Sequence, residues 1–142
     1  MHENELKKMY LQRYRISKQR EQELLDELNT LEGRFILPSK VIDDMPHGGA
    51  GDQDLSEFAA QYDAIYRKIK EQYRKSIRIY EQISDAIEAM EGGEGLKTLL
   101  RYRYISGYSW EQVAVNMHYS YRRVTQLHGL ALEAFKIPKD CL

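Results

Sequence analysis

The longest regular pattern in this 142-residue sequence is an apolar stripe between residues 55 and 91. Its members recur every three or four residues without a break: Leu55, Phe58, Tyr62, Ile65, Ile69, Tyr73, Ile77, Tyr80, Ile83, Ile87 and Met90. This spacing predicts one amphipathic helix, capped by Asp54 and ended by Gly92 and Gly93. At 1.5 Å per residue the helix is about 55 Å long, too long to bury its stripe against a small domain. It therefore needs a second long helix, another chain, or both.

A second helix is predicted over residues 4–32, which lack proline and glycine and are rich in Glu, Lys, Gln, Leu and Arg. Gly33 supplies a stop signal. The prolines and glycines of residues 34–54 predict a connecting loop. The simplest arrangement is an antiparallel coiled-coil hairpin, in which the two helices cover each other's apolar faces.

These patterns predict an all-α protein in two parts. A helical hairpin stalk occupies residues 1–95 and includes the loop at 34–54, and a C-terminal three-helix domain occupies residues 96–142. The surplus apolar surface of the stalk predicts a homo-oligomer. Because Tyr62, Tyr73 and Tyr80 lie on the stripe, we interpret them as core or oligomer interface rather than as stacking platforms for single-stranded nucleic acid.

The last third of the chain carries closely spaced helix-boundary signals. A turn at 106–108 and a break at 118–119 divide it into three predicted helices. Ser109 and Gln112 have the S-x-x-Q spacing of a capping box, and Ser120 stands at an N-cap position. We expect the following residues to be buried: Leu99, Leu100, Tyr104, Ile105, Trp110, Val113, Ala114, Met117, Val124, Leu127, Ala131, Leu132 and Phe135.

A helix held across a short turn from its partner can be laid in the major groove of DNA. Arginine can pair with guanine edges or phosphates, glutamine with adenine, and a helix N-terminus favours phosphate. The alternative is that two adjacent arginines are only solvated surface, and we interpret His128 as a packed residue. The candidate DNA-binding residues are Ser120, Tyr121, Arg122, Arg123, Thr125 and Gln126 on the last helix, with Arg101 and Arg103 before it.

The series Leu100-x-x-Arg103-Tyr104-Ile105-x-Gly107-x-Ser109-Trp110-x-x-Val113-Ala114-x-x-Met117-x-x-Ser120-x-x-x-Val124 resembles region four of bacterial sigma factors, which reads a promoter element. The longer run to Leu132 is similar to small phage and prophage transcriptional regulators of the RinA/ArpU kind. The motif Asp44-Met45-Pro46-His47-Gly48, with a helix on each side, resembles an uncharacterised Firmicutes phage family. The resemblance implies control of late phage genes. Gly129 departs from the pattern, since a basic residue there would strengthen backbone contact.

Charge and cysteine content restrict the remaining possibilities. The net charge is −1, yet residues 96–142 carry seven Lys/Arg against three Asp/Glu, so positive charge gathers on the proposed DNA-binding part. The single cysteine, Cys141, excludes a disulfide framework within one chain, and the four histidines lack metal-site spacing. A cation at His47 and its acidic neighbours is less favoured than a solvated loop. We predict no metal, no cofactor and no enzymatic activity.

The sequence-based hypothesis is a phage- or prophage-encoded, DNA-binding transcriptional regulator that acts in the bacterial cytoplasm. Its partners would be double-stranded DNA, a second copy of the chain through the stalk, and RNA polymerase as a further candidate; no membrane partner is predicted. One alternative is a small terminase-like subunit that recognises DNA for packaging and assembles as a ring. Another is a protein-interaction module that docks on RNA polymerase without touching DNA.

Overall fold

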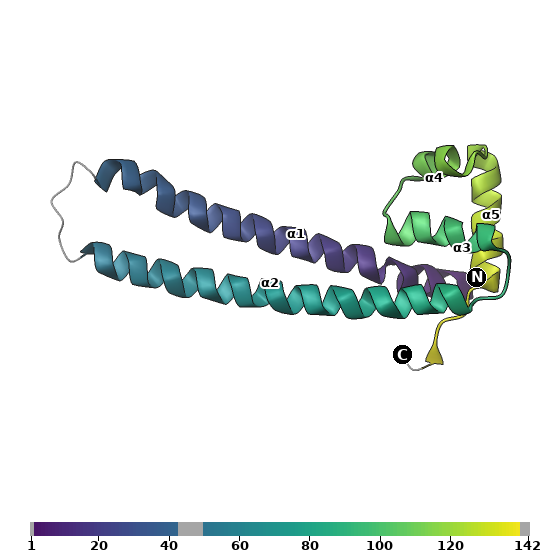
Figure 1. Ribbon diagram of the computed structural model, residues 1–142, viewed down its shortest axis with the longest axis horizontal. Coiled ribbons are helices and arrows are strands. Elements are labelled where there is room, and N and C mark those ends of the chain that lie inside the picture. The colour runs from purple at the N-terminus through teal and green to yellow at the C-terminus, as the bar shows by residue number, and fades with distance from the viewer. Residues whose placement is uncertain (1, 43–49, 140–142) are drawn as a thin grey trace. The chain divides into compact units, whose positions relative to one another are not determined.

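The computed structural model describes residues 2–42 and 50–139, and every regular element within these ranges is helical, which confirms the all-α prediction. None of the helices within them has a stretch long and apolar enough to cross a membrane. The elements, shown in Figure 1, are α1 (His2–Ile42), α2 (Ala50–Ala89), α3 (Glu94–Leu100), the π-helical turn η1 (Arg101–Ile105), α4 (Trp110–Met117) and α5 (Tyr121–Ala134).

The chain divides into two compact units that do not follow chain order. The first, which we call the core unit, joins Met1–Ser17 to Ser76–Leu142. The second, the helix-pair unit, comprises Lys18–Lys75. Helices α1 and α2 each contribute residues to both units. The division at residues 95 and 96 that the sequence suggests stays a prediction.

Two predicted helix ends are wrong. Helix α1 continues through Gly33 to Ile42, because an interior glycine costs only about 1 kcal/mol relative to alanine and the residues before it favour helix. Helix α2 begins at Ala50, so Asp54 lies inside the helix rather than at its N-cap. Much of the predicted loop is thus helical. Residues 43–49, which include Asp43, Asp44 and His47, and Cys141 lie outside the described residues.

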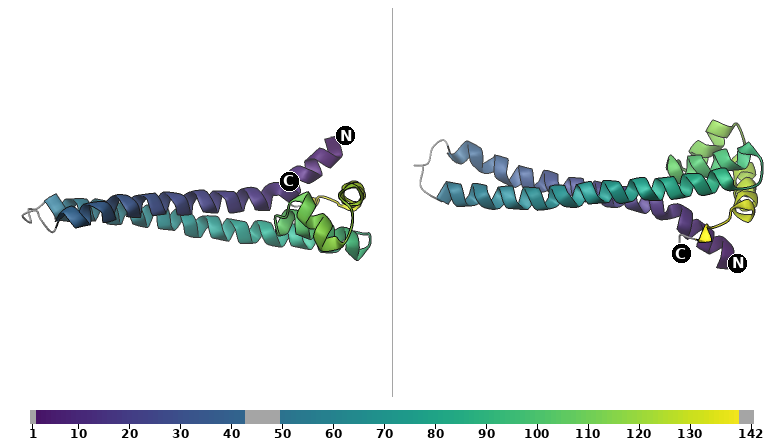
Figure 2. Two further views of the ribbon diagram at one scale, coloured as in Figure 1. Left: turned by 90° about the horizontal axis from the view of Figure 1, so that it is seen from above. Right: turned by 60° about the horizontal axis from the view of Figure 1, so that its bottom comes forward.

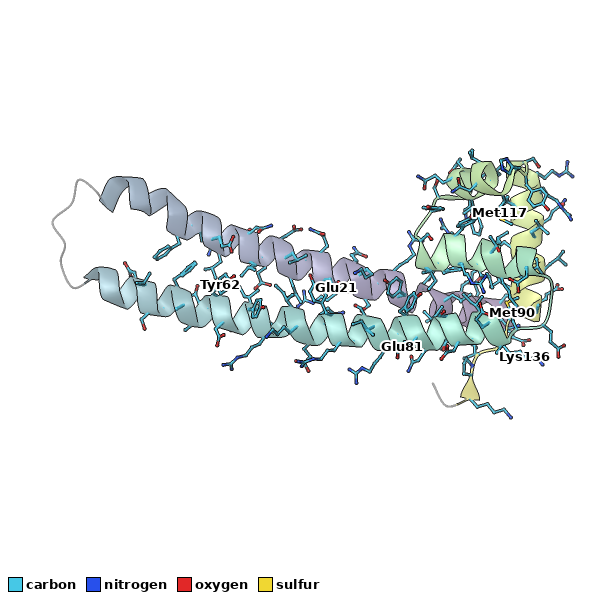
Figure 3. The ribbon with its side chains drawn as sticks, in the orientation of Figure 1. Glu21, Tyr62, Glu81, Met90, Met117 and Lys136 are labelled. Atoms are coloured by element: carbon cyan, nitrogen blue, oxygen red, sulfur yellow. The ribbon has the colours of Figure 1, made fainter. Side chains whose placement is uncertain are left out.

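The core unit has a continuous apolar interior. Of the thirteen residues predicted to be buried in the last third of the chain, nine are buried and four are half-buried, so this prediction is confirmed. In Figure 1, α5 runs crosswise to α3 and α4, and it packs against both. Met90, directly after α2, and Met117 of α4, both labelled in Figure 3, also join this core. The largest fully buried side chains are Phe135, Leu11, Ile83, Ile87, Leu99, Leu100, Val113 and Val124.

Within the core unit, α1 and α2 pair antiparallel. Ser17 Oγ lies 2.6 Å from Ser76 Oγ, and the rings of Tyr14 and Tyr80 lie 5.6 Å apart. As the residue number falls along α1, that of its partner on α2 therefore rises. Beyond these contacts the first turns of α1 diverge from α2 (Figure 2) and meet α5 instead.

The first turns of α1 complete the C-terminal part of the core unit. The buried Lys7 Nζ donates a hydrogen bond of 2.7 Å to the carbonyl oxygen of Leu132. That carbonyl belongs to the last turn of α5, where a cation also complements the helix dipole. The ring of Tyr10 lies 6.0 Å from that of Phe135. A contact across 125 residues of sequence thus closes the core.

The helix-pair unit is more thinly packed. The rings of Phe35 and Phe58 stack at 4.3 Å between its two helices. Among its described residues, only Leu24, Ile69 and Glu21 are buried. Glu21 (labelled in Figure 3) pairs through Oε1 with Lys18 at 2.9 Å, whereas its buried Oε2 has no hydrogen-bond partner among the described residues.

Candidate nucleic-acid interface

The turn between α4 and α5 is fixed by capping groups at both helix starts. Ser109 Oγ accepts a hydrogen bond from the Gln112 backbone N–H, and Gln112 Oε1 accepts one from the Ser109 N–H, which confirms the predicted capping box. Ser120 Oγ accepts from the backbone N–H of Arg123 at 3.1 Å, which confirms the predicted N-cap. Helix α4 ends at Met117 and is followed by the C-cap residue His118, whose φ of 59° lies in the left-handed region. These caps set where α5 begins.

The first two turns of α5 present a continuous exposed surface, which we call the α5 face: Ser120, Tyr121, Arg122, Arg123, Thr125 and Gln126. Val124, in the middle of this run, is fully buried and anchors the helix to the core. Neither Arg122 nor Arg123 forms an ion pair with any described residue, whereas the Thr125 hydroxyl donates to the Tyr121 carbonyl at 2.9 Å. Both guanidinium groups therefore remain available to a ligand.

The two earlier candidate arginines already have partners within the core unit. Arg101 pairs with Glu88 and, at 3.7 Å, with Glu94. Arg103 donates to the Tyr108 carbonyl at 3.0 Å, and its guanidinium lies 4.6 Å from the ring centre of Trp110. Burial lowers the pKa of Arg103, and the positive charge of Arg15 lowers it further. Arg103 nevertheless lies close enough to the α5 face for Tyr121 to raise its pKa slightly against these two effects.

The turn that holds both arginines is π-helical, which the sequence pattern did not predict. The Ser106 N–H donates to the Arg101 carbonyl at 2.9 Å, and the Tyr108 N–H donates to the Tyr102 carbonyl at 3.0 Å. Gly107, with φ of 74°, then lets the chain leave the helix. The wide turn is one of the backbone forms that recur at functional sites.

A half-buried cluster behind the α5 face joins η1, α4 and α5. The Tyr104 hydroxyl and His128 Nε2 share a hydrogen bond of 2.8 Å, and the His128 ring lies 4.5 Å from the ring of Trp110. Burial lowers the pKa of His128 to about 4, helped by the positive charges of Lys8 and Arg103. Burial also raises the pKa of Tyr104 to about 12. Both groups are therefore neutral near pH 7, and His128 packs as predicted.

Sequence reasoning missed two exposed apolar residues beside the α4–α5 turn. Val115 of α4 is 73% exposed. Tyr119 is 49% exposed, whereas the sequence pattern predicts a half-buried position for it at the edge of the domain. Val115 follows two buried residues, Val113 and Ala114, and only its helical phase could have shown that it points outward.

Comparison with protein-family models, with curated proteins and with solved structures finds no match to this chain. The interpretation of the α5 face therefore rests on its own geometry and charge.

Proposed function

We propose that this protein is a DNA-binding transcriptional regulator in which α4 and α5 form a helix-turn-helix and the N-terminus of α5 enters the major groove. In this proposal a helical hairpin built from α1 and α2 carries the DNA-binding part. The observation that supports it most is the α5 face, a run of exposed polar and basic side chains on a helix whose start is fixed by caps and by the buried Val124.

The chemistry of the α5 face suits duplex DNA. Arg122 and Arg123 can reach guanine edges or phosphates, and Gln126, one turn further along, can pair with adenine. The free backbone N–H groups at the start of α5 favour a phosphate. Since Arg101 and Arg103 already have internal partners, the proposal assigns DNA contact to the α5 face and leaves those two residues a structural role.

The test is filter binding of the full chain to a mixed-sequence DNA duplex at several salt concentrations. We expect affinity to fall steeply with salt, because bound Lys and Arg release counterions from the phosphates. Replacing Arg122 and Arg123 together by alanine should weaken binding by about tenfold or more and reduce the salt slope by about 1 for each phosphate that is no longer neutralised. The matched control replaces Lys136 and Lys139, two exposed basic residues after α5, and should change binding much less.

Two outcomes would overturn the proposal. Absence of binding at low salt would exclude a DNA-binding function. Binding that is unchanged by reversal of charge at Arg122 and Arg123 would exclude the α5 face as the DNA contact, whereas docking on RNA polymerase would become the better account if no duplex binds. A ring of eight or more chains in light scattering would instead favour the packaging subunit.

A further inference from the structure

An apolar stripe on α2 within the helix-pair unit remains uncovered by α1. Leu55, Tyr66 and Tyr73 are 52%, 43% and 41% exposed, and Tyr62 between them is half-buried. Phe58 and Ile69, by contrast, are half-buried and buried, and Phe58 stacks on α1. We define the α2 stripe as Leu55, Ala59, Tyr62, Tyr66 and Tyr73. Aromatic residues so exposed at helical spacing mark an interaction surface.

The charges beside the α2 stripe are divided between its two ends. Between residues 54 and 64 there are three acidic residues and no basic one: Asp54, Glu57 and Asp63. Between residues 65 and 75 there are five basic residues and one acidic one: Arg67, Lys68, Lys70, Arg74, Lys75 and Glu71. All of these side chains are exposed. A parallel copy would place like charges together, whereas an antiparallel copy places the acidic end of each helix against the basic end of the other.

The hollow and the exposed rings of the α2 stripe also suit an antiparallel pairing of two copies. A shallow hollow lies over its acidic end, lined by Leu55, Phe58, Ala59, Ala60, Tyr62 and Asp63. Ala59 lies seven residues before Tyr66, and Tyr73 lies seven residues after it. Seven residues are close to two helical turns, so all three share one side of α2 and are spaced by about 10 Å. A twofold axis at Tyr66 would therefore place Tyr73 of each chain over the hollow of the other.

We propose that a second copy of this chain docks antiparallel on the α2 stripe, with the twofold axis at Tyr66. Tyr73 of each copy fills the hollow of its partner, and the two Tyr66 rings meet at the axis. Asp63 of each copy, which pairs with Arg67 of its own helix at 2.9 Å, also faces Lys70 of the other copy. Lys70 Nζ already lies 4.8 Å from the ring centre of Tyr66, at the edge of the stripe. Such a twofold contact is isologous and closes on itself, giving a dimer rather than a filament. This inference does not depend on DNA binding.

The acidic end of the stripe argues against nucleic acid as the occupant. Three carboxylates without a basic residue would repel a phosphate backbone there, so a strand could stack only on Tyr66 and Tyr73 at the basic end and would leave the acidic end of the stripe and its hollow uncovered. A second copy, by contrast, supplies both the aromatic rings and the complementary charge from the same sequence. The chain itself is therefore the partner that the surface fits.

The test is sedimentation velocity of the full chain over a range of concentrations, with no DNA present. We expect a dimer that dissociates on dilution. Tyr73→Ala should weaken dimerisation by about tenfold or more, because a partly exposed ring becomes a buried anchor only in the dimer. Lys70→Glu should weaken it by about tenfold, since the reversed charge meets Asp63 twice across the axis.

The decisive variant exchanges both charges in one chain, Asp63→Lys with Lys70→Glu, and should dimerise more strongly than Lys70→Glu alone. The recovery is partial, because Asp63→Lys also removes the ion pair with Arg67 of the same helix. The matched control is Lys68→Glu, which makes the same charge change about 200° around the helix from both Tyr66 and Lys70 and should leave dimerisation unchanged. Circular dichroism of each variant verifies the helices. A monomer at every concentration, or a dimer indifferent to both Tyr73→Ala and Lys70→Glu, would overturn the proposal. Equal effects of Lys68→Glu and Lys70→Glu would exclude this register.

Discussion

Both units contain residues of α1 and α2, but these helices are packed differently in each unit. In the core unit Leu11, Ile83 and Ile87 of these helices are fully buried in one apolar core with side chains of α3, α4 and α5. Other apolar side chains of α1 and α2 in this unit stay exposed: Leu6, Met9, Ile16, Ile77 and Tyr80. In the helix-pair unit the two helices have only each other, and one of the three buried side chains described there is the carboxylate of Glu21. Two helices alone cannot enclose a stripe wider than their contact. The apolar pattern of α2 thus contributes fully buried residues to a core where α3, α4 and α5 are present, and leaves an exposed stripe where α1 is the only partner.

The sharpest test of this contrast compares one truncation in each unit. Phe135→Ala, at a fully buried position of the core unit, should lower the free energy of unfolding by about 3–5 kcal/mol, because reduced burial and a cavity add together. Leu28→Ala, at a half-buried position of the helix-pair unit, should cost only about 1 kcal/mol. Chemical denaturation followed by circular dichroism measures both. Similar losses would mean that the helix-pair unit is packed as densely as the core unit.

Acidification should lower the free energy of unfolding by a smaller amount, through His128 of the core unit. The described residues of the helix-pair unit contain no histidine that could act in the same way. The pKa of His128 is about 4 in the folded chain, below the ordinary value of 6.5. Between these pH values the unfolded chain binds a proton that the folded chain does not. Stability is therefore complete above pH 6.5 and falls as the pH drops towards 4, by about 2–3 kcal/mol for this partly exposed and solvent-screened ring.

Denaturation curves of the wild type and His128→Gln at pH 7 and pH 4.5 isolate this contribution, because other titrating groups are common to both proteins. We expect the wild type to lose more stability than the variant on acidification. An equal loss in the two proteins would show that His128 does not provide the pH dependence.

The smallest expected changes in the free energy of unfolding come from replacing one helical glycine by alanine in each unit. Gly33 of α1 and Gly129 of α5 lie within helices, and a Cβ added at either would meet no atom within 4 Å. Alanine at each should raise the free energy of unfolding by about 0.5–1 kcal/mol, through the higher helix propensity of alanine. Thermal or urea denaturation can resolve the change. No gain at Gly33 beside a clear gain at Gly129 would mean that the helix-pair unit frays before the core unit unfolds.

Local signals in the sequence predicted local structure well. The capping box at Ser109 and the N-cap at Ser120 need only residues a few positions apart, and both are present. The buried set of the last third followed from helical spacing for the same reason. Gly33 indicated a false helix end because a glycine signal carries about 1 kcal/mol, which a surrounding helix can override. Whether the α5 face binds DNA stays a prediction.

Long-range contacts could not have been read from the pattern. Nothing near Lys7 in the sequence indicates that its ammonium group would meet the Leu132 carbonyl. In the sequence, Arg101 resembles a phosphate ligand as much as Arg122 does, and only the fold shows that Arg101 forms an ion pair with Glu88. Basic residues on adjacent helices are chemically alike in sequence, and their partners decide which remain free. The sequence therefore could not show that Arg101 and Arg103 have partners within the fold whereas Arg122 and Arg123 form no ion pair with any described residue.

The cluster behind the α5 face makes Trp110, the single tryptophan of the sequence, a built-in optical probe. Its indole lies against the His128 ring of α5 and beneath the Arg103 guanidinium, so its emission depends on how α5 sits on the rest of the domain. A ligand that shifts α5 would change the intensity or wavelength of that emission without any attached dye. Titrations of the unlabelled protein can thus follow the candidate site directly.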